Sequence, residues 1–271
     1  MQLDPAGFNA LCTCRWGPMV YNKHDVYVGR SLGKYGEFSW LEQALFQRIV
    51  TRGATVVDAG ANVGAHTVPL SKYVGEQGKV HAFEPQRLVF QALCANLALN
   101  QGENVHAYRE ALGADEGIGR VPNPDPRASN NFGGVSMHES DAVEPVRRRT
   151  LDSLELPACH FIKADVEGME AEVLRGASAT IEAHRPVLYV ENDREERSAD
   201  LITLIAGMRY EIFWHTPPLF NPDNFARDRE DIFNGVVSVN LLCLPAESKR
   251  EIAGLRRVTS PTDRWNLASN K

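Results

Sequence analysis

The chain has 271 residues, 43% of them hydrophobic, and its 35 acidic residues outnumber its 29 basic ones, giving a formal net charge of −6. This length and composition allow one large globular domain with a sizeable core. The acidic balance disfavours a protein that binds nucleic acid through a basic face, and no apolar run approaches the roughly 18 residues of a membrane span.

The cysteines and the N-terminus indicate the cellular compartment. Five cysteines are present, an odd number, and none forms a CxxC pair or a zinc-ligand spacing with histidines. We interpret all five as free thiols in a reducing environment. The first residues lack the basic and apolar segments of a signal peptide, so we expect a cytoplasmic protein.

Residues 1–50 are expected to form an extension, a hairpin and a helix, that packs on the core. The segment 19–30 predicts two short strands around the polar turn Asn22–Asp25. A stretch punctuated by glycine follows it. Apolar residues at helical spacing then predict a helix from Trp40 to Val50.

Residues 51–245 alternate between apolar runs of strand length and amphipathic helices. The expected strands are 54–58, 79–84, 104–109, 159–165, 186–191, 210–214 and 236–244. The expected helices are 65–74, 88–100, 170–183 and 199–206, and a loop is expected at 120–149. This alternation predicts an α/β fold: a Rossmann-like, mostly parallel seven-stranded sheet with helices on both faces. Residues 246–271 are expected to be a charged peripheral tail.

Polar side chains stand at the ends of the expected strands. Four are acidic (Asp58, Glu84, Asp165 and Glu191), and the other two are Arg109 and His215. Ligands of such sheets bind beyond the carboxyl ends of the strands, near the point where the strand order reverses. Carboxylates beside a core are costly unless they bind something, so we expect the ligand site at this edge.

The first strand is followed by a glycine-rich turn, VVDAGANVGAHT, at residues 56–67. Gly60, Asn62 and Gly64 stand where the chain must turn from a strand into a helix, and glycine lets the backbone approach a ligand closely. The second strand ends in FEP (83–85), where Glu84 is placed to accept hydrogen bonds from ribose hydroxyls. Both features also occur in NAD enzymes, but the pair together is more typical of methyltransferases.

Five motifs together resemble the FkbM family of methyltransferases over roughly residues 30–245. They are VVDAGANVGAHTVPL (56–70), HAFEP (81–85), EALG (110–113), IKADVEGMEAEVLRGA (162–177) and YVEN (189–192). The resemblance implies a class I methyltransferase fold, S-adenosylmethionine as the methyl donor, and O-methylation of a sugar or natural-product hydroxyl.

The resemblance also implies which residues bind the donor. Asp58, Gly60 and Asn62 would face its methionine end, Glu84 would hold the ribose, and Ala111 would border the adenine. Glu37, ahead of the first strand, is expected either to reach the donor's amino group or to cap a helix. The full expected set is Glu37, Asp58, Gly60, Asn62, Gly64, Glu84, Pro85 and Ala111.

Methyl transfer from a sulfonium is an in-line displacement, so the enzyme mainly positions the acceptor, and a base assists a hydroxyl acceptor. The expected catalytic residues are Lys163, Asp165, Glu191 and His215, with His215 either the general base or a structural histidine. Asp165, Glu191 and Asn192 resemble the acid, acid-Asn arrangement that holds magnesium in catechol-type enzymes. They would bind Mg²⁺, or else orient substrate hydroxyls or cap helices.

The expected contacts with the acceptor come from strand ends and two loops rich in Asn, 129–134 and 217–225. They are Asn131, Glu167, Asn192 and Asn221. Amide and carboxylate groups among aromatic rings suit a sugar. The partner is therefore expected to be a small molecule or glycan rather than a membrane or nucleic acid, and a homodimer is compatible with the sequence.

Three other interpretations stay open. The first is methylation of RNA or protein, which the acidic balance disfavours for RNA because only Arg147–Arg149 forms a dense basic run. The second is an NAD-dependent oxidoreductase, for which no catalytic Tyr-Lys couple is well placed. The third is a donor-binding scaffold without catalysis, against which the intact Asp58, Gly60 and Glu84 argue.

Overall fold

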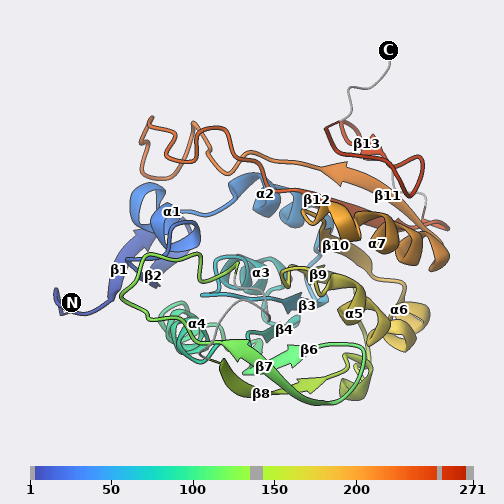
Figure 1. Cartoon of the computed structure of the whole chain (residues 1–271), viewed down its shortest axis with the longest axis horizontal. Helices are drawn as coiled ribbons and strands as arrows, with labels where there is room; N and C mark the ends of the chain where they lie inside the picture. The colour runs from blue at the N-terminus through green and yellow to red at the C-terminus, as the bar shows by residue number, and fades with distance from the viewer. Residues whose placement is uncertain (1–3, 135–142, 249–251, 267–271) are drawn as a thin grey trace.

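A computed structural model describes residues 4–134, 143–248 and 252–266, with an eight-stranded sheet at its centre (Figure 1). The strand order is β13-β11-β12-β10-β9-β3-β4-β5. Neighbours from β10 to β5 pair in parallel, whereas β12 pairs antiparallel with β10 and β11. The strands are β3 (Thr55–Ala59), β4 (Lys79–Phe83), β5 (Val105–Tyr108), β9 (Phe161–Ala164), β10 (Val187–Glu191), β11 (Tyr210–His215), β12 (Asn240–Pro245) and β13 (Arg256–Arg257).

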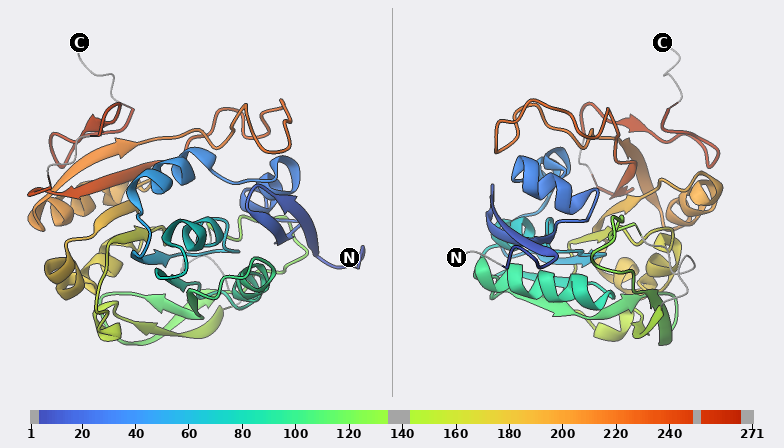
Figure 2. Two further views of the ribbon diagram at one scale, coloured as in Figure 1. Left: turned by 180° about the vertical axis from the view of Figure 1, so that it is seen from behind. Right: turned by 60° about the vertical axis from the view of Figure 1, so that its left-hand side comes forward.

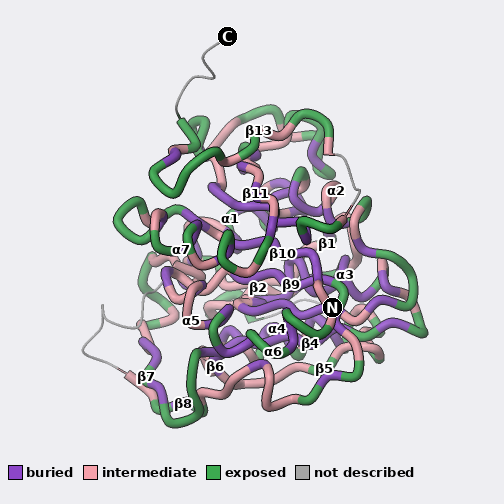
Figure 3. Tube along the Cα trace, turned by 90° about the vertical axis from the view of Figure 1, so that its right-hand side faces the viewer, coloured by how far each residue is buried: buried purple, intermediate pink, exposed green. Residues whose placement is uncertain are grey.

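Helices cover both faces of this sheet, as predicted. One face carries α2 (Trp40–Ile49), α3 (Thr67–Val74) and α4 (Arg87–Leu99), and the other carries α5 (Glu170–Arg175), α6 (Ser178–His184) and α7 (Glu195–Gly207). The central strands are buried along their length (Figure 3) because apolar side chains point to both helix layers. Phe46 and Leu70 pack on one face, and Val173 and Ile202 on the other.

The N-terminal segment forms a hairpin, β1 (Asn9–Cys14) and β2 (Gly17–Asn22), followed by α1 (Val28–Tyr35). Asn96 of α4 joins this hairpin to the core. Its side-chain nitrogen donates to the carbonyls of Val20 (2.9 Å) and Val63 (2.8 Å), and its oxygen accepts from Val20 N–H at 2.6 Å. A buried amide therefore makes the hydrogen bonds that a second neighbouring strand, on the side away from β1, would give to β2.

A small three-stranded sheet lies beyond β5 in the chain. It consists of β6 (Glu110–Leu112), β7 (Gly117–Pro122) and β8 (Val143–Arg149), in the order β6-β8-β7, and a 3₁₀ turn, η1 (Asp152–Leu154), follows. The long connector between β11 and β12, residues 216–239, runs over α1 (Figure 2). Phe233 of this connector packs on Tyr35 of α1, and this contact places the connector above the carboxyl edge of the sheet.

Several expected elements were wrong. The strands expected within 19–30 are instead β2 and the start of α1, and the hairpin turns at Arg15 and Trp16. Glycines inside α1 hid the helix: a Cβ on Gly29 would collide with Asn22 O and one on Gly33 would crowd Tyr21, so close packing explains both.

The region 120–149, expected to be a loop, contains the end of β7 and all of β8, with 135–142 outside the described residues. The expected helix 170–183 is two helices. It breaks at Gly176, where a Cβ would collide with the carbonyl of Gly113. The last strand is shorter than expected, and the C-terminal segment, of which 249–251 and 267–271 are outside the described residues, adds β13 to the sheet edge. No helix within the described ranges is long and apolar enough to cross a membrane.

The docking role of Asn96 predicts a stability effect. Asn96→Ala should lower the free energy of unfolding by about 2–3 kcal/mol, because the Val20 and Val63 backbone groups lose their buried partner. Gln91→Ala, an exposed position of the same helix, should change it by less than about 0.5 kcal/mol. Urea denaturation of both variants measures this, and equal effects would contradict the role assigned to Asn96.

Candidate functional site

The strand order reverses between β3 and β9, and a cavity of about 390 Å³ opens beyond the carboxyl ends of β3, β4, β9 and β10. Strands diverge from such a switch point, which leaves room for a ligand. The expected ligand edge of the sheet is thus hollow. Eight of the residues expected at the site line the cavity: Gly60, Asn62, Glu84, Asn131, Lys163, Asp165, Glu167 and Glu191.

The glycine turn forms one wall of this cavity. Gly60 has a φ of +79°, and a Cβ there would collide with the carbonyl oxygen of Asp165, so only glycine fits. The N–H groups of Gly60 and Ala61 donate to Phe83 O at 3.0 and 2.9 Å, which ties the turn to the end of β4. Gly64 lies behind the wall against Leu93 and does not line the cavity.

Glu84 is held rigidly at the end of β4. Its two carboxylate oxygens accept from the backbone N–H groups of Asn62 (3.0 Å) and Gln86 (2.8 Å). Burial raises the pKa of the Glu84 carboxyl to about 7, although these two donors oppose the shift. Because only two donors reach Glu84, its carboxylate oxygens keep further lone pairs, and a hydroxyl group of a ligand could donate hydrogen bonds to them.

A narrower cavity of about 70 Å³ adjoins the first and shares Gly60 and Glu84 with it. Pro85 and Ala111 line it, together with the apolar side chains of Phe83 and Val121. Flat apolar walls next to a carboxylate fit an adenine ring beside its ribose.

Lys163 is buried between the two central strands and is surrounded by carboxylates. Its Nζ lies 3.3 Å from Asp58 Oδ1 and 3.2 Å from Asp165 Oδ2, and it donates to Gly60 O at 3.3 Å. Burial alone would lower the pKa of Lys163, but Asp165, Asp58 and Glu42 outweigh it and raise the pKa above its ordinary value. Lys163 is therefore a fixed cation that positions its neighbours, not a base.

Asp165, Glu167 and Glu191 form a carboxylate cluster, with one oxygen of each within 4.8 Å of the others. Burial, then the charges of Asp165 and Glu167, raise the pKa of Glu191 well above its usual value. Burial and Asp165 raise the pKa of Glu167 to about 8 even though Arg194 binds it at 2.6 Å. Glu191 Oε2 is buried and has no hydrogen-bond partner within the described part of the chain.

The DVEG turn after β9 is held by Glu170. Its Oε1 accepts from the N–H groups of Val166 and Gly168, both at 3.0 Å, and burial raises its pKa to about 7. Glu167 and Gly168 both have positive φ (58° and 89°) in this turn. The last acid of DVEGME, Glu170, thus fixes the turn that carries Glu167.

Asn192 does not join the expected metal set. Its side-chain nitrogen donates to Ser198 Oγ at 2.9 Å, in the core under α7, and it lines neither cavity. The side chain points away because neighbouring residues of an extended strand face opposite sides. Among the described residues, Glu167 takes its place beside Asp165 and Glu191 as an oxygen ligand that could share one metal ion.

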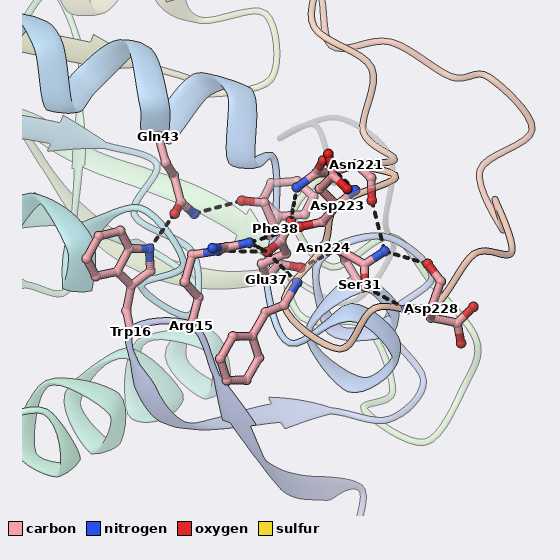
Figure 4. A network of polar contacts seen from close by, with 11 residues as sticks. Arg15, Trp16, Ser31, Glu37, Phe38, Gln43, Asn221, Asp223, Asn224 and Asp228 are labelled. Carbon is pink, nitrogen blue, oxygen red and sulfur yellow. Dashed lines mark hydrogen bonds and ion pairs between the residues drawn. The ribbon is translucent and has the colours of Figure 1, made fainter.

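Glu37 and Asn221 bind each other instead of a ligand (Figure 4). Glu37 accepts from Arg15 Nη2 at 2.6 Å, from Asn221 Nδ2 at 2.8 Å and from Phe225 N–H at 2.9 Å. Neither side chain lines the cavity, which places Glu37 and Asn221 away from where the donor and the acceptor are expected. Both residues fasten the connector 216–239 to the N-terminal segment.

His215 lies on a different cavity, of about 790 Å³, under α2 and β13. Its Nδ1 lies 2.8 Å from the hydroxyl of Tyr189, and burial lowers its pKa. This placement beside Tyr189 favours the structural alternative for His215. Asn131 does reach the first cavity, although its oxygen also accepts from Gly134 N–H at 2.9 Å.

Sequence reasoning missed Glu42, His66, Tyr27 and Phe38, which all line the cavity. A signal for Glu42 existed: it stands four residues before Phe46 on the apolar face of the expected helix, where a carboxylate needs a partner. For Tyr27 there was none, because its approach depends on how α1 and the connector fold over the sheet.

Comparisons with known proteins identify the family of the chain. A family model described as the methyltransferase FkbM domain matches residues 58–212, more than half of the chain. The hexuronic acid methyltransferase AglP of Haloferax volcanii is 32% identical over 127 residues, which cover 46% of this chain and 51% of AglP. The chain thus matches about half the length of that relative.

Solved structures with a similar arrangement include two methyltransferases. The FkbM methyltransferase of Methylobacillus flagellatus superposes with a TM-score of 0.47 at 21% identity, over 75% of this chain and 50% of that one. A SAM-dependent methyltransferase of Aquifex aeolicus gives 0.41 at 16% identity, over 79% and 93%.

The raised carboxyl pKa values predict how stability depends on pH without ligand. Between about pH 6.5 and 8 the folded chain still holds protons on Glu84, Glu167 and Glu170, whereas unfolded carboxyls are already ionised. The free energy of unfolding should therefore fall as pH rises through this window. The lowered pKa values of His81 and His215 act below it. Urea titrations at several pH values measure this, and a rising stability would contradict the carboxyl assignments.

Proposed function

Because the chain belongs to the FkbM methyltransferase family, we propose that it transfers a methyl group from S-adenosylmethionine to a hydroxyl of a sugar or glycoconjugate. The relative AglP is named for a hexuronic acid acceptor, which supports a sugar as the acceptor class. The match spans only part of that protein, so the cavity of this chain is the stronger guide to its acceptor.

The donor fits the residues present. Gly60 gives the close backbone approach, the lone pairs of Glu84 suit ribose hydroxyls, and Pro85 and Ala111 border the adjoining apolar cavity. A cationic donor also suits a site rich in carboxylates. When bound, S-adenosylmethionine supplies an electrophilic methyl group on a positively charged sulfur.

The observation that carries the acceptor class is Glu191 Oε2, a buried carboxylate oxygen with no partner in the described residues. A buried acceptor of this kind is costly until a donor such as a hydroxyl reaches it. Glu191 lines the same cavity as Asp165 and the rings of Tyr27 and Phe38. Carboxylates beside aromatic rings are the groups that bind the hydroxyls and the apolar face of a sugar.

The charges of the cavity favour an uncharged acceptor over RNA. Its two described cations are already paired: Lys163 with Asp58 and Asp165, and Arg194 with Glu167 and Asp193. No described cation is left to neutralise phosphates, which nucleic acid binding requires. The charges that line the cavity therefore support an acceptor that is uncharged and bears hydroxyl groups.

Glu191 would also accept the proton that the acceptor hydroxyl gives up as the oxygen–carbon bond forms. A raised pKa makes Glu191 a stronger base once it is ionised, so the rate should increase with pH. Asp165 and Glu167 would orient neighbouring hydroxyls. The same three carboxylates have the oxygen chemistry of a Mg²⁺ site, which would replace the proton acceptor by a Lewis acid.

Transfer of labelled methyl groups to a panel of glycosides tests this proposal. The panel should pair a neutral hexoside with its uronate, and include RNA and a protein lysate, each with and without EDTA. Glu191→Gln should lower kcat/KM for the preferred glycoside by about 10²–10⁴-fold, as expected for loss of a base. Exposed Glu195→Gln, on α7, is the control. Labelling of RNA or protein but of no glycoside would contradict the proposal, and loss of activity in EDTA would assign the cluster to a metal.

A further inference from the structure

His66 and Glu42 form a buried pair in the cavity wall that the proposed transfer does not use. His66 is only 6% exposed, and neither of its ring nitrogens has a hydrogen-bond partner among the described residues. Its Nε2 lies 3.4 Å from Glu42 Oε2, an ion-pair distance without hydrogen-bond geometry. Buried polar groups without partners are rare and call for an explanation.

Packing holds both side chains in place. The His66 ring lies between Phe38 and Phe46, with ring centroids 5.8 and 5.5 Å away. Glu42 Oε1 accepts from Asn240 Nδ2 at 3.2 Å. Burial opposes the charge of Glu42, but His66, then a hydrogen bond from Ser238 and then Lys163 outweigh it and lower its pKa to about 2, so Glu42 is a carboxylate at any physiological pH.

The pair lines the larger cavity but not the apolar cavity in which the nucleoside would bind. The apolar cavity and Glu84 fix where the nucleoside binds, and both cavities meet at Gly60 and Glu84. The larger cavity is also lined by Ala65, His66 and Glu42, which do not line the smaller one. His66 also stands at the N-terminus of α3, where unsatisfied N–H groups and the helix dipole favour an anion.

We propose that His66 and Glu42 bind the amino-acid end of S-adenosylmethionine. A ring N–H of His66 donates to the α-carboxylate of the donor, assisted by the N-terminus of α3, and the Glu42 carboxylate accepts from its α-ammonium. A hydrogen-bond donor and a carboxylate side by side are complementary to this zwitterion. The inference rests on the donor assigned above, and it replaces Glu37, which the connector 216–239 occupies.

Calorimetric binding of three ligands that share the nucleoside tests each charge separately. S-adenosylmethionine carries both charges, decarboxylated S-adenosylmethionine keeps the ammonium alone, and 5′-methylthioadenosine has neither. The wild-type protein should bind the first at least about tenfold more tightly than the second, the value of a charge-assisted hydrogen bond.

Variants should then change affinity according to the charge each ligand carries. His66→Gln should weaken the binding of S-adenosylmethionine by about tenfold to a hundredfold. It should change the affinities for the other two ligands by no more than about twofold. Glu42→Gln should weaken the binding of both ligands that carry the ammonium group and leave the affinity for 5′-methylthioadenosine unchanged. His81→Gln, a buried histidine that hydrogen-bonds Tyr108 outside the cavity, is the matched control.

Binding of 5′-methylthioadenosine reports whether each variant folds. The preference of the wild-type protein for S-adenosylmethionine over its decarboxylated form is measured without any variant, so it tests the proposal even if a variant does not fold. Equal losses for all three ligands, or unchanged S-adenosylmethionine affinity with turnover lost, would overturn the proposal. The second result would place His66 on the acceptor side. Failure of every adenosyl ligand to bind the wild type would instead overturn the donor assignment itself.

Discussion

The buried ammonium of Lys163 is the interaction on which the site depends. It stands at the switch point between β3 and β9 and contacts Asp58 on the first strand and Asp165 just beyond the second. It also donates to Gly60 O in the glycine turn. Breaking such a buried pair leaves an uncompensated charge, which typically costs about 3–5 kcal/mol. One cation therefore fixes the glycine turn, Asp58 and Asp165 relative to one another.

Around this cation the site carries more carboxylates than their neighbours can neutralise. Glu84, Glu167 and Glu191 all have pKa values raised by burial, which disfavours their charged forms in the free protein. A cationic donor and a hydroxylic acceptor would supply the positive charge and the hydrogen-bond donors that these groups lack. The burial of these carboxyl groups thus has two consequences: it makes the stability of the ligand-free protein depend on pH, and it leaves the groups available to bind ligands.

The sequence predicted the backbone of the site better than its side chains. The β/α alternation, the glycine turn and Glu84 follow from local rules, because periodicity and turn chemistry are visible in neighbouring residues. Glu37 and Asn221 lie away from the cavity because they bind each other across 184 positions of the chain, which no local pattern reveals. Asn192 was misassigned because the residue after β10 points into the core, toward Ser198.

Helix α1 and the connector 216–239 show a second limit. Glycines in α1 read as breaks, yet they allow the helix to pack closely on the hairpin. The connector carries no periodic pattern, but it places Leu219 and Val239 over the cavity. Tertiary packing determines the conformation of α1 and of the connector. It also brings Glu42 of α2 next to His66 at the start of α3.

The most direct test of the account is calorimetric titration of the wild-type chain with S-adenosylmethionine and, separately, with NAD, repeated for Glu84→Gln. Glu84 is the one carboxylate assigned to the ribose, and Glu103→Gln, exposed at the opposite edge of the sheet, is its control. We predict that S-adenosylmethionine binds and NAD does not, and that Glu84→Gln weakens binding by about tenfold to a hundredfold. Tighter binding of NAD, or binding of S-adenosylmethionine that is indifferent to Glu84, would contradict the donor site.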